Sequence, residues 1–123
     1  MNVTEQQVKQ LAAIGFLAAG HGLINEGEAI FNGLKAWRPE SEYPLIGLAL
    51  TKIGACQYDA AHAILTDQAL KLNPASATAK CFVGLALKLA GRVHEGERWL
   101  KEVAAADDQE ARTLAETLLG EAA

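Results

Sequence analysis

The residues of this chain that could bind a metal ion or act as nucleophiles are few and widely separated. The three histidines, His21, His62 and His94, include no His-x-x-x-His pair and no neighbouring set of zinc ligands. The two cysteines, Cys56 and Cys81, are 25 residues apart and lack the Cys-x-x-Cys spacing of redox and metal sites. We therefore predict no metal site and interpret the cysteines as free thiols of a cytoplasmic protein, with a disulfide as the alternative.

Pairs of carboxylates are the other source of acid–base chemistry in this sequence. Glu26 with Glu28, and Asp107 with Asp108, stand at the starts of expected helices, where the helix dipole favours negative charge. The sequence contains no Gly-x-Ser-x-Gly motif and no phosphate-binding loop. We therefore interpret the carboxylates as helix-capping residues, and we predict no enzymatic activity and no cofactor.

Composition indicates one small helical domain. Of the 123 residues 50% are apolar and 6% aromatic, with 11 glycines and 3 prolines, which excludes a disordered chain or a turn-rich β-sandwich. The net charge is −4, and residues 92–123 contain eight acidic against four basic residues, so we expect no nucleic-acid partner. The longest apolar run, residues 11–20, is too short for membrane insertion, and the first residues do not resemble a secretory signal.

A repeat of 34 or 35 residues positions the few special residues of the chain. Five columns of this repeat contain Gly15, Ala49 and Gly84; Gly22, Cys56 and Gly91; Gly27, Ala61 and Gly96; Phe31, Leu65 and Leu100; and Pro39, Pro74 and Asp108. Small residues let two antiparallel helices cross closely, Phe or Leu fills the gap beside the crossing, and proline ends the second helix. The third copy lacks the proline and contains Lys80 where a large apolar residue is usual, and the helix expected over 58–72 contains an extra residue.

These columns resemble the tetratricopeptide pattern of Leu-Gly, Tyr, Ala, Phe and Pro at fixed offsets, although the Tyr position contains Ala18, Lys52 and Leu87. The resemblance implies an all-α fold, a right-handed α-solenoid of three helix pairs plus a C-terminal capping helix. We expect a single domain over 1–123, with repeats at about 8–41, 42–76 and 77–108 and the capping helix at about 109–120. The expected helices cover 4–20, 24–37, 42–54, 58–72, 75–90, 93–105 and 109–120.

Local signals support several of these helices. Thr4 with Gln7, and Asp107 with Glu110, have the spacing of a capping box. The last helix has one apolar stripe at helical spacing, which suits a helix that seals the stack. The stripe consists of Ala111, Leu114, Ala115, Leu118 and Leu119. The repeat also places Gly22, Cys56 and Gly91 in tight turns that favour a positive φ, so the non-glycine Cys56 predicts a differently shaped second turn.

A concave groove is the candidate functional site, because in tetratricopeptide stacks the first helix of each pair lines a groove that binds peptides or helices. The resemblance places these residues in it: Ala12, Phe16, Tyr43, Ile46, Leu50, Ile53, Cys81, Phe82 and Leu85, with Lys9 and Lys88 at its edges. Their apolar character disfavours a Lys and Asn clamp for a C-terminal carboxylate. The segment from Leu45 to Leu50 is apolar all round its helix and needs cover on both faces.

The sequence does not determine what occupies the groove. An amphipathic helix or a hydrophobic extended segment of a partner suits an apolar groove. Terminal helices of the chain or a second copy of it would also fill the groove. We interpret Trp37 and Trp99 as packing residues between repeats, with binding hot spots as the alternative, and Tyr43 as either packing or contacting a partner at the mouth of the groove.

Four segments carry a more specific resemblance: Ala29-Ile30-Phe31, the stretch from Gly33 to Glu40, Tyr58-Asp59-Ala60-Ala61, and Asp107 to Arg112 leading into Leu114. They resemble the small tetratricopeptide chaperones of bacterial type III secretion systems, such as those that hold the needle subunit. The resemblance implies a cytoplasmic, non-enzymatic chaperone whose groove holds the amphipathic C-terminal helix of a needle subunit and prevents premature polymerisation. It also implies that a small helical co-chaperone could cover the first repeat. The alternatives are a general tetratricopeptide adaptor and a self-associating scaffold.

Overall fold

The computed structural model describes residues 4, 6, 7, 24–107 and 109–119, and these contain helices and no strand. The helices are α2, Ile24–Trp37; α3, Tyr43–Gly54; α4, Tyr58–Ile64; η1, Leu65–Ala69; α5, Leu70–Leu72; α6, Ala77–Leu89; α7, Val93–Ala104; and α8, Gln109–Leu119. The segments α4, η1 and α5 follow one another directly and form one continuous helix. From residue 24 onwards, every observed helix begins and ends within two residues of its expected bounds. The helix expected over 4–20 lies almost wholly outside the described residues.

Side-chain hydrogen bonds cap two of the expected helix starts, at Thr4 and at Ser76. The Thr4 N–H donates to Gln7 Oε1 at 2.9 Å, and the Gln7 N–H donates to Thr4 Oγ1 at 3.1 Å, which confirms the first capping box. The side chain of Glu110 lies outside the described residues, so the second box stays a prediction. Ser76, which the sequence patterns did not single out, caps α6 by accepting a hydrogen bond from the Ala79 N–H at 3.2 Å.

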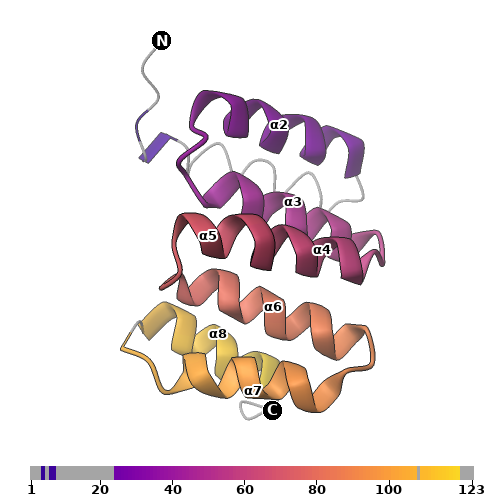
Figure 1. The fold of residues 1–123 in the computed structure, drawn as a ribbon, viewed down its shortest axis with the longest axis vertical. Helices are drawn as coiled ribbons and strands as arrows, with labels where there is room; N and C mark the ends of the chain where they lie inside the picture. Colours follow the sequence, from indigo (N-terminus) through magenta and orange to yellow (C-terminus); the bar gives the residue numbers. More distant parts are fainter. Residues whose placement is uncertain (1–3, 5, 8–23, 108, 120–123) are drawn as a thin grey trace.

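The helices stack in layers along one axis (Figure 1). The second repeat consists of α3 with the continuous α4–η1–α5 helix, the third of α6 with α7, and α2 packs on α3 at the N-terminal side. At the other end α8 packs on both α6 and α7, as a capping helix must. Its apolar stripe is turned inward, with Ala111 and Ala115 buried. In the described part of the chain, no helix is long and apolar enough to cross a membrane.

The helix crossing of the third repeat depends on two glycines, as expected. A Cβ on Gly96 would lie 2.6 Å from the Gly84 carbonyl oxygen and 3.0 Å from the Lys88 backbone nitrogen. A Cβ on Gly84 would lie 2.6 Å from the Leu100 side chain. The backbones of α6 and α7 therefore approach to a distance that only glycine permits, and the buried Leu100 fills the space beside them. In the second repeat Ala49 and Ala61, both fully buried, occupy the corresponding positions.

The turns within the second and third repeats have the same hydrogen-bond pattern. The Gln57 N–H donates to the Lys52 carbonyl at 2.8 Å and the Cys56 N–H to the Ile53 carbonyl at 2.9 Å, which is a Schellman motif. The Arg92 and Gly91 N–H groups repeat this pattern on α6, at 2.9 and 3.1 Å. Cys56 has a φ of 62° and Gly91 a φ of 90°. The prediction that Cys56 gives the second turn a different shape is therefore wrong, because the helix C-cap imposes a left-handed residue whatever its type.

The extra residue of the second repeat is absorbed by the π-helical turn η1. Phe31 and Leu65 are 34 residues apart, whereas Pro39 and Pro74 are 35 apart, so the additional residue lies between Leu65 and Pro74. The π-helical turn covers Leu65–Ala69, inside this interval. A π-turn adds one residue to a helix without ending it. The rest of the helix thus continues to Leu72, and Pro39 and Pro74 follow the ends of α2 and α5 by two residues, as predicted.

The core runs through the stack as adjoining clusters. The largest one includes Leu45, Ala49, Leu65 and Leu87, and Trp99 packs against it from α7, as expected for a residue between repeats. Trp37 behaves differently, because 55% of its surface is exposed at the end of α2. The assignment of Trp37 to inter-repeat packing is therefore wrong.

Candidate functional site

Five of the nine predicted groove residues are partly exposed side chains of α3 and α6, two helices that contact each other. The five residues are Tyr43, Leu50, Ile53, Phe82 and Leu85. Leu50, Ile53 and Phe82 also contact the main core cluster, so the core itself supports this face. The spacing within each helix, 43–50 and 82–85, keeps the side chains on one side of it. We call these five residues, together with Leu89, the apolar face.

Leu89 belongs to this set although sequence reasoning did not include it. It lies seven residues after Phe82, two helical turns further along the same side of α6, and 48% of its surface is exposed. The 82–85–89 spacing is visible in the sequence and could have indicated it. The apolar face therefore extends to the C-terminal end of α6.

The structure places two predicted groove residues in the core. Ile46 is 2% exposed and packs with Leu45 and Ala49 in the largest cluster. Cys81 is fully buried, and its thiol donates to the Ala111 carbonyl of α8 at 3.5 Å. Neither side chain offers surface to a partner, so their assignment as lining residues is corrected. Cys81 is buried because the capping helix α8 covers that side of α6.

The remaining residues of the predicted groove, Ala12 and Phe16, lie outside the described residues, as does Lys9 at its edge. Lys88, the other edge residue, donates from Nζ to the Leu118 carbonyl at 2.8 Å. It therefore bonds to a carbonyl in the last turn of α8 and links α6 to the capping helix.

The apolar face is uncharged along both helices. Within α3 and α6 the charged side chains are Lys52, Lys80 and Lys88. Lys52 pairs with Glu28 of α2 at 3.0 Å, and Lys80 pairs with Glu102 of α7 at 3.1 Å. All three lysines thus engage neighbouring helices. The side chains that α3 and α6 contribute to this face are uncharged and mostly hydrophobic, which favours an amphipathic or apolar segment as its ligand.

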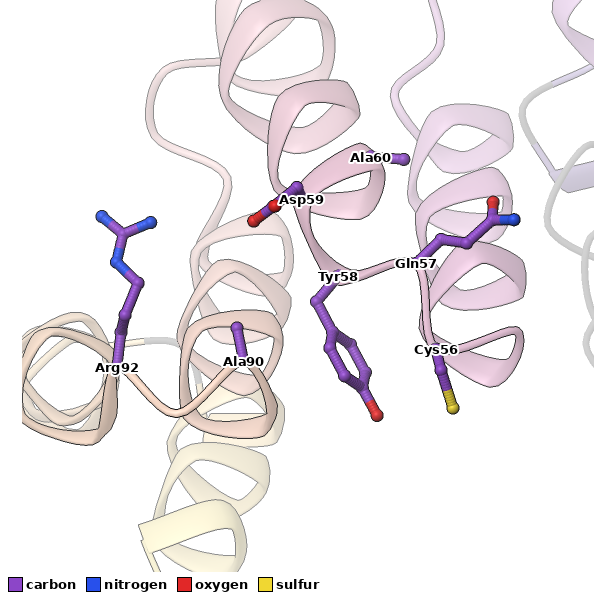
Figure 2. Close-up of a pocket in the computed structure, with 7 residues that line it drawn as sticks. All are labelled: Cys56, Gln57, Tyr58, Asp59, Ala60, Ala90 and Arg92. Carbon is purple, nitrogen blue, oxygen red and sulfur yellow. The ribbon is translucent and has the colours of Figure 1, made fainter.

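A separate cavity of about 450 Å³ lies between the turns of the second and third repeats. Figure 2 shows the Cys56 and Tyr58 side chains pointing in the same direction, while Arg92 extends from the other wall. A side-chain hydrogen bond with Cys56, together with desolvation, raises the pKa of Tyr58 above 10.0. Arg92, the N-cap residue of α7, forms two hydrogen bonds with Glu95 in the first turn of that helix, at 3.1 and 2.7 Å, so its charge is paired.

Among the residues that the structure describes, no three His, Cys, Asp or Glu side chains lie close enough together to hold a metal ion.

Comparison with known structures defines the fold. The type III secretion translocator chaperone SycD of Yersinia enterocolitica is similar over 96% of this chain and 89% of its own, with a TM-score of 0.78 and 17% identity. The tetratricopeptide domain of Sgt2 from Aspergillus fumigatus is similar over 97% of this chain and 80% of its own, with a TM-score of 0.71 and 14% identity. The fold is that of tetratricopeptide-like helical repeats. No family model and no curated protein sequence matches the chain.

A third similar structure contains a bound peptide. It is SycD of Yersinia enterocolitica in complex with a peptide of the translocator YopD, with a TM-score of 0.67 and 15% identity over 100% of both chains. The similar structures thus include chaperones of type III secretion as well as a tetratricopeptide domain from a fungus.

Proposed function

We propose that this chain is a non-enzymatic chaperone of a bacterial type III secretion system, and that its apolar face binds an amphipathic segment of a client protein. The single observation that carries the proposal is the uncharged apolar face on α3 and α6, in a fold like that of secretion chaperones. A peptide-bound structure of SycD supports the same mode of action. Such a chaperone would act in the cytoplasm, before its client is exported.

The free energy of this binding would come from burial of apolar surface. Each Å² of apolar surface removed from water contributes about 25 cal/mol, before the cost of association is subtracted. An amphipathic helix presents residues at i, i+3, i+4 and i+7, which matches the spacing of Phe82, Leu85 and Leu89 on α6. A client held in this way hides the surface through which it would otherwise polymerise or aggregate.

The identity of the client is the finer part of the proposal. The resemblance of the sequence favours the C-terminal helix of a needle subunit, with a small helical co-chaperone on the first repeat. The peptide bound to SycD, in contrast, comes from a translocator. Both clients would present an apolar segment to the same face. The chemistry of the face therefore does not select between them, and binding experiments must do so.

A general tetratricopeptide adaptor outside secretion is the second candidate. The similarity to the Sgt2 domain supports it, because that TM-score of 0.71 is comparable to those of the secretion chaperones. A self-associating scaffold is the third candidate, in which a second copy covers the apolar face.

Co-expression with candidate needle subunits and translocators, followed by affinity purification, tests the proposal. We expect one client to copurify with the wild type and to be lost with Leu85→Glu. Leu72→Glu is the matched control, because Leu72 is 45% exposed on α5, outside the apolar face. A client that copurifies equally with Leu85→Glu would refute the role of the face. A purified protein whose mass doubles without any client would favour the scaffold.

A further inference from the structure

A second cavity lies on the opposite side of α3 from the apolar face. It has a volume of about 210 Å³ and lies between α2, α3 and the α4–η1 helix. Leu48 lines it, whereas Leu50, two residues later, belongs to the apolar face. Two residues on an α-helix point about 200° apart. A ligand in this cavity would therefore bind independently of a client on the apolar face.

The repeat explains why this cavity is open. The register that relates Leu65 to Leu100 also relates Lys52 to Leu87 and Ile64 to Trp99, all at 35 residues. In the third repeat Leu87 is 1% exposed, and Trp99 packs against the core cluster that contains Leu87. In the second repeat the corresponding Lys52 and Ile64 line the cavity. A lysine and an isoleucine thus stand in the second repeat where the third repeat has a buried leucine and a tryptophan.

The cavity combines an apolar floor with a polar rim. Leu45 and Leu48, both buried, form the floor from α3. Two lysines from different helices stand at the rim: Lys35 on α2 and Lys52 on α3.

The rim lysines have only weak or exchangeable partners. Lys52 pairs with Glu28 at 3.0 Å, and both of these side chains are about 30% exposed. Lys35 donates to Gln68 Oε1 at 3.4 Å, a long hydrogen bond. Gln68 is part of the π-turn η1, so the turn that absorbs the extra residue of the second repeat contributes to this wall. With two ammonium groups against one carboxylate, the rim carries an excess of positive charge.

We propose that this cavity is a binding site for a carboxylate on a short aliphatic stem, as found at the end of a peptide or in an acidic side chain. The carboxylate bridges Lys35 and Lys52 and displaces Glu28 from Lys52, while the stem covers Leu45, Leu48 and Ile64. Charge complementarity selects the carboxylate, and the apolar floor selects the stem. The site is thus a second binding surface on the back of the repeat stack.

NMR titration of the ¹⁵N-labelled full chain with small probes tests this proposal. N-acetyl-leucine, with its free α-carboxylate, mimics a chain end. N-acetyl-glutamic acid α-amide, with its free side-chain carboxylate, mimics an acidic side chain, and N-acetyl-leucinamide is the uncharged control. We expect saturable shifts at Lys35, Lys52 and Gln68, with a dissociation constant on the order of 1–10 mM for a ligand of this size. The tighter of the two carboxylates identifies the source. Equal binding of the uncharged amide, or shifts spread over all lysines, would overturn the proposal.

Variants that copy the third repeat make the test specific. Ile64→Trp fills the cavity as Trp99 does and should abolish saturable binding, and Lys52→Leu should weaken it several-fold. Glu28→Gln removes the competing carboxylate and should strengthen binding about two- to threefold. Lys71→Met, an exposed lysine on α5, is the control and should leave binding unchanged. Weaker binding by Glu28→Gln, or undiminished binding by a folded Ile64→Trp, would contradict the assignment.

Discussion

Replacing Gly96 by alanine, with Gly33→Ala as the control, separates two effects of glycine: its low helix propensity and the close approach of α6 and α7 that it permits. Both glycines lie within helices. A Cβ at Gly33 would meet no atom within 4 Å, whereas a Cβ at Gly96 would lie 2.6 Å from the Gly84 carbonyl oxygen and 3.0 Å from the Lys88 nitrogen. Both of these close atoms are backbone atoms. The clash at Gly96 is therefore relieved only when α6 and α7 move apart.

The expected magnitudes follow from these contacts. Alanine in place of glycine within a helix is worth about 0.5–1 kcal/mol, so Gly33→Ala should stabilise the protein by that amount. At Gly96 the same gain is offset by overpacking, which costs about 1–3 kcal/mol, and by lost dispersion across a widened α6–α7 contact. We expect a net destabilisation of about 1–2 kcal/mol. In a chain of this size that lowers the melting temperature by roughly 3–8 °C.

Thermal and urea unfolding followed by far-ultraviolet circular dichroism measures both variants. The expected result is opposite signs: a higher midpoint for Gly33→Ala and a lower midpoint for Gly96→Ala. A Gly96→Ala protein as stable as Gly33→Ala would show that the helix pair has room for a methyl group. In that case glycine would not set the closeness of the α6–α7 crossing.

Three further predictions concern single side chains. Cys56→Gly should stabilise the protein by about 1 kcal/mol in urea unfolding, because it relieves a left-handed non-glycine residue. In a Tyr43→Phe background, absorbance titration should show Tyr58 ionising above pH 10.0, and Cys56→Gly should return the midpoint towards that value; an unchanged midpoint refutes the hydrogen bond. Trp99→Ala should cost about 3 kcal/mol or more, and Trp37→Ala, at a site 55% exposed, well under half of that; equal losses would contradict the packing described above.

The architecture was predictable because the residues that determine helix packing and helix ends recur at a regular spacing. Glycine at the crossing, leucine beside it and proline after the second helix each have a steric role, and they recur every 34 or 35 residues. Gly84, Gly96 and Leu100 occupy the places that this reasoning assigned to them. The extra residue in the helix over 58–72 was also visible, although its form, a π-turn, was not.

The functional surfaces were less predictable, because one sequence pattern serves both burial and binding. Ile46 and Leu50 are both apolar and four residues apart on α3, yet one is 2% exposed and the other is partly exposed. Cys81 is buried by α8, a contact between distant segments that periodicity does not encode. The sequence signals the cavity at Lys52 only when the repeats are compared, because the third repeat contains Leu87 at the equivalent position.

Cys56 shows the same limit in the backbone. Residue type disfavours its positive φ, but the hydrogen bonds from Cys56 and Gln57 to the end of α3 require it. The hydrogen bonds that end α3 thus override the preference of a non-glycine residue for a negative φ.

The affinity of the apolar face for its client tests the central claim most directly. Fluorescence anisotropy with labelled peptides, one from the C-terminal helix of a needle subunit and one from a translocator, would be measured against four proteins. We predict that Leu50→Glu and Leu85→Glu each weaken the bound peptide by at least about 50-fold, since each loses apolar burial and places a charge against the client. Leu72→Glu should bind as the wild type does. Equal affinities for all four proteins, with the variants still helical, would contradict the account.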